Sequence, residues 1–138
     1  MKPRSSFVGL VCGKLICLAK RCTFDQGKKV PYGGYWSLFG GSIEKGESPF
    51  FAAHRELMEE ANIDLPLNKL KYCKTYRNDA GSLHIYFAEL DDIINPELNF
   101  EHTEYGWFEM DTIDNFPYLI DDKIVDAIKK YQKNRYIS

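Results

Sequence analysis

Residues 48–61 have a helical pattern and lie between two groups of β-rich runs, so the fold must combine a sheet with at least one helix. Ser48 is a favoured N-cap and Pro49 suits the first helical position, while Asn62 tolerates the left-handed conformation that ends a helix. Apolar residues at spacings of three and four predict the buried stripe of this helix, which consists of Phe50, Ala53, Leu57 and Ala61.

Runs rich in apolar, β-branched and aromatic residues predict strands on both sides of this helix. They cover residues 7–12, 14–21, 36–39, 70–77, 82–90 and 107–110. Gly13-Lys14 predicts a hairpin turn between the first two runs, and residues 78–81 predict another between the fourth and fifth. The run at 36–39 leads into a pair of glycines.

The rest of the chain predicts two loops and a second helix. Polar residues dominate 23–34 and 91–104, which indicates irregular structure. In the run 82–90, alternating apolar residues predict a single buried face made of Leu83, Ile85 and Phe87. The closing helix over 121–134 is expected to turn Ile124, Val125 and Ile128 inward.

This order of elements predicts a mixed α/β (α+β) fold in one domain that covers residues 1–138. A chain of this length is typical of a single domain, and it contains no repeat, low-complexity tract or linker. Its 44% hydrophobic and 28% charged content is that of an ordinary globular protein. The 14% of aromatic residues favours a bulky core, a stacking site for a flat ligand, or both.

The charge balance argues against a partner that is a nucleic-acid polymer. The 18 Lys and Arg residues are offset by 20 Asp and Glu, whereas binding along a phosphate backbone needs a surplus of cations. No apolar stretch approaches the roughly 20 residues of a membrane span, and the run 7–12 lacks the features of a signal peptide. We therefore expect a cytoplasmic chain, complete from residue 1, that does not contact membranes.

The four cysteines are expected to be free thiols in a reducing compartment. Cys12, Cys17, Cys22 and Cys73 form no Cys-x-x-Cys pair, and no histidine lies at zinc-finger spacing from them. A disulfide framework is also not expected in a chain large enough to build a hydrophobic core.

Three carboxylates crowd one face of the first predicted helix. Glu56, Glu59 and Glu60 lie at positions i, i+3 and i+4, where like charges destabilise a helix by about 0.2–0.5 kcal/mol per pair. Arg55 offsets part of this repulsion through an i,i+4 contact with Glu59. The residues alone leave two interpretations open: a solvated acidic face, or ligands for a hard divalent cation such as Mg²⁺ or Mn²⁺.

The surrounding spacing favours the second interpretation. Gly41 is followed after five residues by Glu47, and after seven more by Arg55-Glu56-Leu57-Met58-Glu59-Glu60-Ala61-Asn62-Ile63. This ordered set resembles the signature box of the Nudix hydrolases. Asn62 stands where the family has glycine, and Phe39 stands where many members have proline before the glycine pair. Neither difference removes a ligand.

The resemblance implies a fold, a cofactor and a set of roles. The fold would be an α/β/α sandwich with a mixed sheet between helices, and the cofactor Mg²⁺, with Mn²⁺ as a substitute. The metal ligands would be Glu56, Glu59, Glu60 and the carbonyl of Gly40, and Glu59 would also help to activate water. Arg55 would orient these acids, and Glu47 would pair with Arg55 or with the start of the helix.

Further candidates lie outside the box. A distal acid often completes such sites, and we prefer Glu101 over Glu104. The alternative for each is an ordinary surface acid without a functional role. Arg21 is a candidate to hold a phosphate or is simply a cation at the end of a strand. Among loop tyrosines that could stack on a base (Tyr32, Tyr35 and Tyr105), Tyr35 is our candidate, with rim packing as the alternative. No ligand role is assigned to His54, His84 or His102.

The resemblance implies hydrolysis of a phosphoanhydride bond in a nucleoside diphosphate linked to another moiety. A proline that marks many ADP-ribose enzymes is replaced by Asn78, and a tyrosine of some diadenosine polyphosphate enzymes is also absent. We therefore favour nucleoside triphosphates, oxidised ones included. ADP-ribose or dinucleotide hydrolysis, and a nucleotide-sensing domain without catalysis, are the alternatives. The partner would be a small nucleotide, and the protein a monomer or homodimer.

Overall fold

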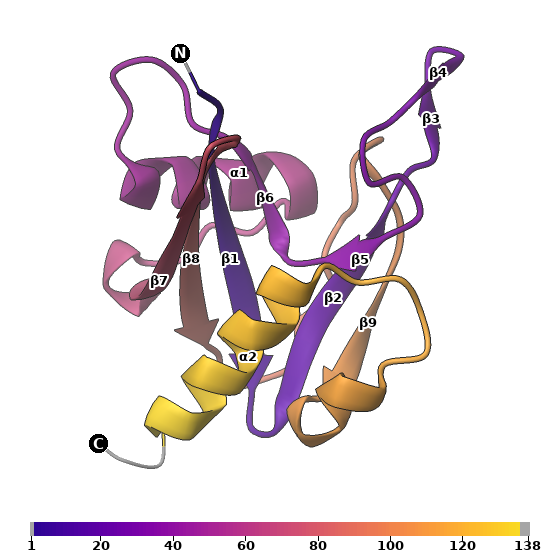
Figure 1. Cartoon of the computed structure of the whole chain (residues 1–138). Coiled ribbons are helices and arrows are strands. Elements are labelled where there is room, and N and C mark those ends of the chain that lie inside the picture. The colour runs from indigo at the N-terminus through magenta and orange to yellow at the C-terminus, as the bar shows by residue number, and fades with distance from the viewer. Residues whose placement is uncertain (1, 136–138) are drawn as a thin grey trace.

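The computed structural model describes residues 2–135 and shows a mixed sheet between two helices (Figure 1). The main sheet has the order β5-β2-β1-β8-β7, with β6 beside β1 and β9 beside β2. The strands are β1 (Arg4–Cys12), β2 (Leu15–Arg21), β3 (Phe24–Asp25), β4 (Lys28–Lys29), β5 (Trp36–Ser37), β6 (Phe39–Ser42), β7 (Lys71–Asn78), β8 (Gly81–Glu89) and β9 (His102–Glu109). The helices are α1 (Pro49–Ala61) and α2 (Asp122–Arg135), with short 3₁₀ turns η1 (Leu67–Lys69) and η2 (Met110–Asn115).

Each face of the sheet is covered by one helix. On one face, Leu57 of α1 packs in a buried cluster with Val8 and Leu10 of β1. On the other, Ile124 and Ile128 of α2 join the second cluster. The predicted α/β (α+β) sandwich with a mixed sheet between helices is therefore confirmed.

The first predicted helix is confirmed at both ends. Ser48 caps it, because its hydroxyl accepts a hydrogen bond from the N–H of Phe51 at 3.2 Å. Asn62 adopts the left-handed conformation, with φ 55°, and its N–H donates to the carbonyl of Met58 at 3.0 Å. Asn62 thus takes the backbone geometry that a glycine would take there. Within the expected stripe, Ala53, Leu57 and Ala61 are buried, and Phe50 packs at the margin of their cluster.

The buried face predicted for β8 is present, although Leu83 is only half-buried, and the strand buries its other face as well. Ile85 and Phe87 are buried as expected, but Tyr86 and Ala88 on the opposite face are buried too. Tyr86 and Ala88 belong to the α1 cluster, whereas Ile85 and Phe87 belong to the α2 cluster. A central strand with helices on both sides of its sheet loses the apolar–polar alternation on which the prediction relied.

Three other segments differ from the sequence prediction. The run 36–39 is divided into two strands, because β5 pairs with β2 and β6 pairs with β1. The loop predicted over 23–34 contains the hairpin β3–β4, and β9 begins at His102 inside the other predicted loop. Pairing with partners distant in sequence holds β5, β6 and β9, and local patterns do not reveal it. The strands of the hairpin β3–β4 pair locally, but they are too short and too polar to show a strand pattern.

The strands β1 and β2 pair only next to their connecting turn, at Val11↔Ile16 and Cys12↔Leu15. Beyond this point they diverge, and the segment from β5 to β6 fills the space between them, with β5 on β2 and β6 on β1. The glycine pair that follows Phe39 lies in β6 and is therefore held directly above α1.

The described cysteines form no disulfide, and Cys17 and Cys22 are buried. Burial raises the pKa of the Cys17 thiol to about 12, so this thiol is protonated at neutral pH. Over residues 2–135, the two helices are too short or too polar to cross a lipid bilayer.

Replacing Leu57 with alanine should lower the free energy of unfolding by about 3 kcal/mol, because Leu57 is fully buried between α1 and the sheet. Urea denaturation measures the difference. The neighbouring Met58→Ala variant is the control, since Met58 is exposed on the same helix and should change stability by less than about 0.5 kcal/mol. Similar losses in the two variants would contradict the packing described for α1.

Candidate functional site

Three carboxylates from two distant segments meet beneath β6. Glu56 and Glu60 lie one turn apart on α1 and are 7% and 1% exposed. Glu101 comes from the segment just before β9. One oxygen from each of these side chains lies within 4.8 Å of the other two. We call this group the carboxylate cluster.

The glycine pair of β6 makes room for the cluster. The N–H of Gly40 donates a hydrogen bond to Glu60 Oε1 at 2.8 Å. A Cβ at Gly40 would lie 1.8 Å from the Phe7 ring, and a Cβ at Gly41 would lie 2.8 Å from the Glu56 carboxyl. Larger residues at these positions would therefore displace β1 or the carboxylate of Glu56.

Arg55 connects the acids around the cluster. Its guanidinium makes two hydrogen bonds to Glu47, at 2.8 and 2.9 Å, and contacts Glu56 and Glu59 at 3.1 Å. It also donates to the carbonyl of Ser42 at 3.0 Å. The hydrogen bond to Arg55 lowers the pKa of Glu47, and Glu47 in turn raises the pKa of Arg55. Glu47 thus pairs with Arg55, one of the two partners considered from the sequence.

Two acids of the cluster are poorly compensated by the protein itself. Burial, together with the neighbouring Glu101 and Glu56, raises the pKa of Glu60 to about 10, although the hydrogen bond from the Gly40 N–H opposes this. Burial also raises the pKa of Glu56, although Arg55 opposes this. Within residues 2–135, Glu60 Oε2 is buried and has no hydrogen-bond partner.

This donor set fits a divalent cation. Hard cations such as Mg²⁺ prefer carboxylate oxygens, and a buried carboxylate oxygen without a donor gains its missing partner when a cation binds. The glycine pair leaves the backbone close to the same oxygens. Glu56, Glu60 and Glu101 are therefore the residues that could hold a metal.

The other predicted acids lie outside the cluster. The side chain of Glu59 is 52% exposed and accepts hydrogen bonds from Arg55. Glu104 is exposed on β9, where its backbone pairs with Lys20, so the structure brings Glu101 to the cluster and not Glu104. The functional roles assigned to these acids stay predictions.

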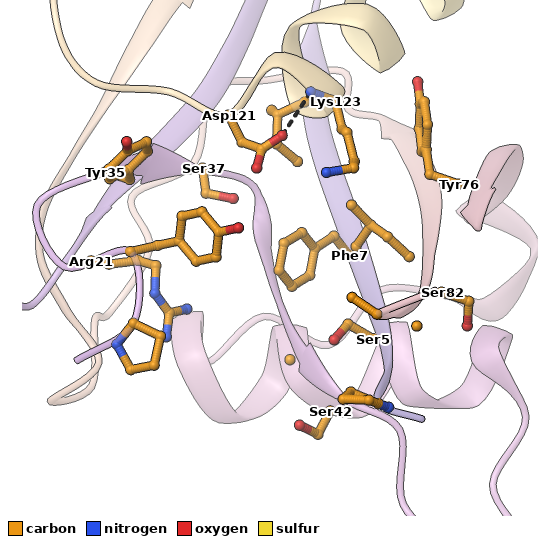
Figure 2. A pocket seen from close by; sticks show the side chains of 18 of the residues that line it. Ser5, Phe7, Arg21, Tyr35, Ser37, Ser42, Tyr76, Ser82, Asp121 and Lys123 are labelled. Carbon is orange, nitrogen blue, oxygen red and sulfur yellow. Dashed lines mark hydrogen bonds between the residues drawn. The ribbon is translucent and has the colours of Figure 1, made fainter. Parts of the chain in front are cut away.

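A cavity of about 380 Å³ adjoins the cluster and contains both predicted substrate-binding residues (Figure 2). Arg21 and Tyr35 line it, as do Gly41 and Ser42 of β6. Tyr105 does not: it lies on β9, and its hydroxyl donates to Asn95 Oδ1 at 3.0 Å. We call this space the first cavity.

Sequence reasoning missed several residues that line the first cavity. Phe7 of β1 lies in the middle of the view in Figure 2, with Lys123 and Asp121 from the start of α2 above it. The Trp36 N–H donates to the carbonyl of Leu119 at 2.8 Å and ties this segment to β5. The apolar run that contains Phe7 indicated only a core strand, and no local signal identified Lys123.

His102 is buried at the start of β9, where its backbone pairs with that of Arg21, and neither ring nitrogen has a hydrogen-bond partner among the described residues. Burial and the nearby Arg21 lower its pKa to about 4, so the ring is neutral at physiological pH. It contacts the Phe39 ring edge-on at 5.4 Å. Phe39, the aromatic residue that departs from the signature pattern, therefore packs against the residue that follows Glu101 in the chain.

Comparisons with known proteins agree with this geometry. The family model of the NUDIX domain matches residues 2–128. The chain is 26% identical over 129 residues to an oxidized purine nucleoside triphosphate hydrolase of Danio rerio. The aligned region covers 91% of this chain and 76% of that protein. Three other curated relatives match shorter segments, and the chain spans between 11% and 35% of their length.

Solved structures share the fold. A MutT NUDIX hydrolase from Burkholderia pseudomallei superposes with a TM-score of 0.74 at 23% identity, covering 94% of this chain and 98% of that one. The NUDIX domain of Shewanella oneidensis NrtR, solved in complex with ADP ribose, gives a TM-score of 0.77 at 16% identity, with 98% and 89% covered. At these identities the likeness establishes the architecture.

Without divalent ions, Glu60→Gln should stabilise the protein increasingly as the pH rises from 5 to 9. The unfolded chain ionises Glu60 near its ordinary pKa, whereas the folded protein keeps it protonated up to about pH 10. The wild-type protein should therefore lose up to about 1.4 kcal/mol of relative stability per pH unit across this range. Glutamine keeps the acceptor for Gly40 without the charge.

Urea denaturation in the presence of a chelator measures this difference at each pH. Glu104→Gln is the matched control and should follow the wild-type pH dependence, because Glu104 is exposed outside the cluster. If the difference between wild type and Glu60→Gln does not change with pH, Glu60 is ionised in the folded protein and the assignment of its raised pKa is wrong.

Proposed function

Because this chain belongs to the Nudix family, we propose that it is a Mg²⁺-dependent hydrolase that cleaves a phosphoanhydride bond of a nucleoside triphosphate, oxidised nucleotides included. The observation that carries the proposal is the carboxylate cluster, whose buried Glu60 oxygen lacks a donor, beside a cavity with aromatic and cationic walls. A solvated acidic face, the other interpretation of these acids, would not bury two of them.

Glu56, Glu60 and Glu101 would hold the metal, with the carbonyl of Gly40 as a further predicted ligand. A bound Mg²⁺ neutralises the charge of a diphosphate and lowers the pKa of a coordinated water. Arg55 fixes Glu56 and Glu59 through its hydrogen bonds, which reduces the entropy lost when the substrate is positioned. Glu59 is a predicted metal ligand too, and its exposed carboxylate is our candidate to accept the proton of the attacking water.

The first cavity would hold the nucleoside and the adjoining phosphate. Phe7 and Tyr35 offer aromatic surfaces for a base, and Arg21 offers a cation near the cluster. The similarity to an oxidized purine nucleoside triphosphate hydrolase, over 91% of the chain, supports the choice of a triphosphate. We retain the expectation of a cytoplasmic enzyme with a small nucleotide partner.

ADP-ribose or dinucleotide hydrolysis is the second candidate. One structurally similar NUDIX domain was solved in complex with ADP ribose, and the first cavity of this chain has aromatic walls on which a flat base could stack. A domain that senses nucleotides without cleaving them is the third. The chain keeps every acid of the signature, and this favours an enzyme over a sensor.

Glu59→Gln and Glu60→Gln should each lower kcat by about 100-fold. Glu60→Gln removes a carboxylate that would bind the metal, and Glu59→Gln removes the candidate acceptor for the proton of the attacking water. Glu101→Gln should also lower it, whereas the matched Glu104→Gln variant should stay within about twofold of wild type. Release of phosphate and pyrophosphate from a panel of nucleotides, with product identification, measures these rates.

This experiment distinguishes the three candidates. Absence of turnover on the whole panel, combined with tight nucleotide binding, would replace the enzyme by a sensor. Faster turnover of ADP-ribose than of triphosphates would overturn the substrate assignment. Equal losses in Glu101→Gln and Glu104→Gln would show that proximity to the cluster does not decide which acid matters.

A further inference from the structure

A second cavity of about 380 Å³ adjoins the same cluster. It shares Glu101 with the carboxylate cluster and Arg21 with the first cavity. Its other walls include Lys28 and Lys29 of β4 and Phe100. The two cavities therefore meet at Arg21, and each adjoins the cluster, the first through Gly41 beside Glu56 and the second through Glu101.

The lysines belong to a hairpin with a defined geometry. β3 and β4 pair at Phe24↔Lys29 and Asp25↔Lys28, and the turn between them has positive φ at both residues, 52° at Gln26 and 79° at Gly27. Figure 1 shows this hairpin projecting beyond the end of β2.

The base of the hairpin is tied to the cluster. The Cys22 N–H donates to the carbonyl of Glu101 at 2.8 Å, and the Val30 N–H donates to the carbonyl of Thr23 at 2.9 Å. The residue that contributes a carboxylate to the cluster thus also anchors the segment that carries Lys28 and Lys29. Backbone hydrogen bonds therefore help to fix the position of Lys28 and Lys29 relative to the cluster.

The charges of the second cavity are unbalanced. Three cations, Arg21, Lys28 and Lys29, face Asp25 and Glu101, and none of the three forms an ion pair with any residue in the described part of the chain. In the same range two other lysines form ion pairs, Lys74 with Asp126 at 3.3 Å and Lys129 with Asp114 at 3.0 Å. A concave surface with unpaired cations attracts an anion, and phosphate oxygens accept hydrogen bonds from lysine well.

We propose that the second cavity binds the phosphoryl groups that extend beyond the diphosphate held at the carboxylate cluster. This inference rests on the proposed function and specifies its substrate class as nucleosides with three or more phosphates. A linear substrate would place its base in the first cavity and its terminal phosphate beside Lys28 and Lys29, with Arg21 between the two. In a nucleoside diphosphate linked to a sugar, the group that enters the second cavity is uncharged and gains nothing from these lysines.

The first test measures binding without turnover. The full chain with Mg²⁺ is titrated calorimetrically with two analogues that resist hydrolysis: a nucleoside triphosphate with methylene groups in place of both bridging oxygens, and the methylene-bridged diphosphate of the same nucleoside. The double variant Lys28→Gln/Lys29→Gln should bind the triphosphate analogue about tenfold more weakly and the diphosphate analogue within about twofold of wild type. Both lysines are exposed, so the variant should fold normally.

A matched control removes the same charge elsewhere. Lys69→Gln/Lys71→Gln changes two exposed lysines that line neither cavity, and it should bind both analogues as wild type does. Kinetics supply the second test: in Lys28→Gln/Lys29→Gln, KM for a nucleoside triphosphate should rise about tenfold with kcat within about twofold, while KM for ADP-ribose should not change.

Unchanged triphosphate binding in Lys28→Gln/Lys29→Gln, an equal loss for both analogues, or an equal loss in the control would each overturn the inference. So would failure of the wild-type protein to bind the triphosphate analogue more tightly than the diphosphate analogue. Absence of hydrolysis by the wild-type protein would overturn the proposed function alone. The role of the second cavity is tested separately, because the difference in affinity between the triphosphate and diphosphate analogues is measured without turnover.

Discussion

The crowding of three carboxyl groups, two of them buried, is the constraint around which this part of the protein is arranged. One oxygen from each of Glu56, Glu60 and Glu101 lies within 4.8 Å of the other two, and Glu56 and Glu60 are buried while Glu101 is half-buried. In a buried position each unpaired charge costs several kcal/mol. The protein supplies only partial compensation, through the Gly40 N–H and the Arg55 guanidinium. A packed core would not retain such a cluster for stability, since apolar side chains of similar size would serve better. The remaining deficit of positive charge is what a divalent cation would supply.

Divergence of two strands gives the cluster its surroundings. β1 and β2 pair over a short distance and then separate, and the chain from β5 to β6 bridges them. This arrangement sets the glycine pair over the acidic face of α1, and the bond from Trp36 to Leu119 brings the start of α2 to the same opening. The first cavity is thus bounded by segments from both ends of the chain, and its shape depends on long-range pairing rather than on any one motif.

The sequence predicts those features that depend on neighbouring residues. The caps of α1, its buried stripe and the spacing of its acids are local, and each appears in the structure as expected. The limits of β9 and the division between β5 and β6 depend on partners far along the chain, which local patterns do not reveal. The hairpin β3–β4 pairs locally, but its two-residue polar strands are too short to show a strand pattern. The same reason explains why Glu101 and Glu104 could not be separated by sequence: the bend before β9 turns one inward and leaves the other exposed. Lys123 had no recognisable pattern, because only the fold brings α2 to the cavity.

The distribution of charge links the cluster to the cavities. The chain carries a formal net charge of -2, and its charges are unevenly placed at this site. The carboxyl groups lie at the centre with Arg55 as their partner, whereas the cations that line the cavities are Arg21, Lys28, Lys29 and Lys123. Within residues 2–135, Arg21 and the two hairpin lysines form no ion pair with the carboxylate cluster. These cations therefore do not neutralise the acids of the cluster. A ligand that satisfies both groups must carry a cation at its middle and negative charge on either side. A metal-bound polyphosphate has this charge pattern, whereas a free anion would be repelled by the centre and a free cation would leave the lysines unsatisfied.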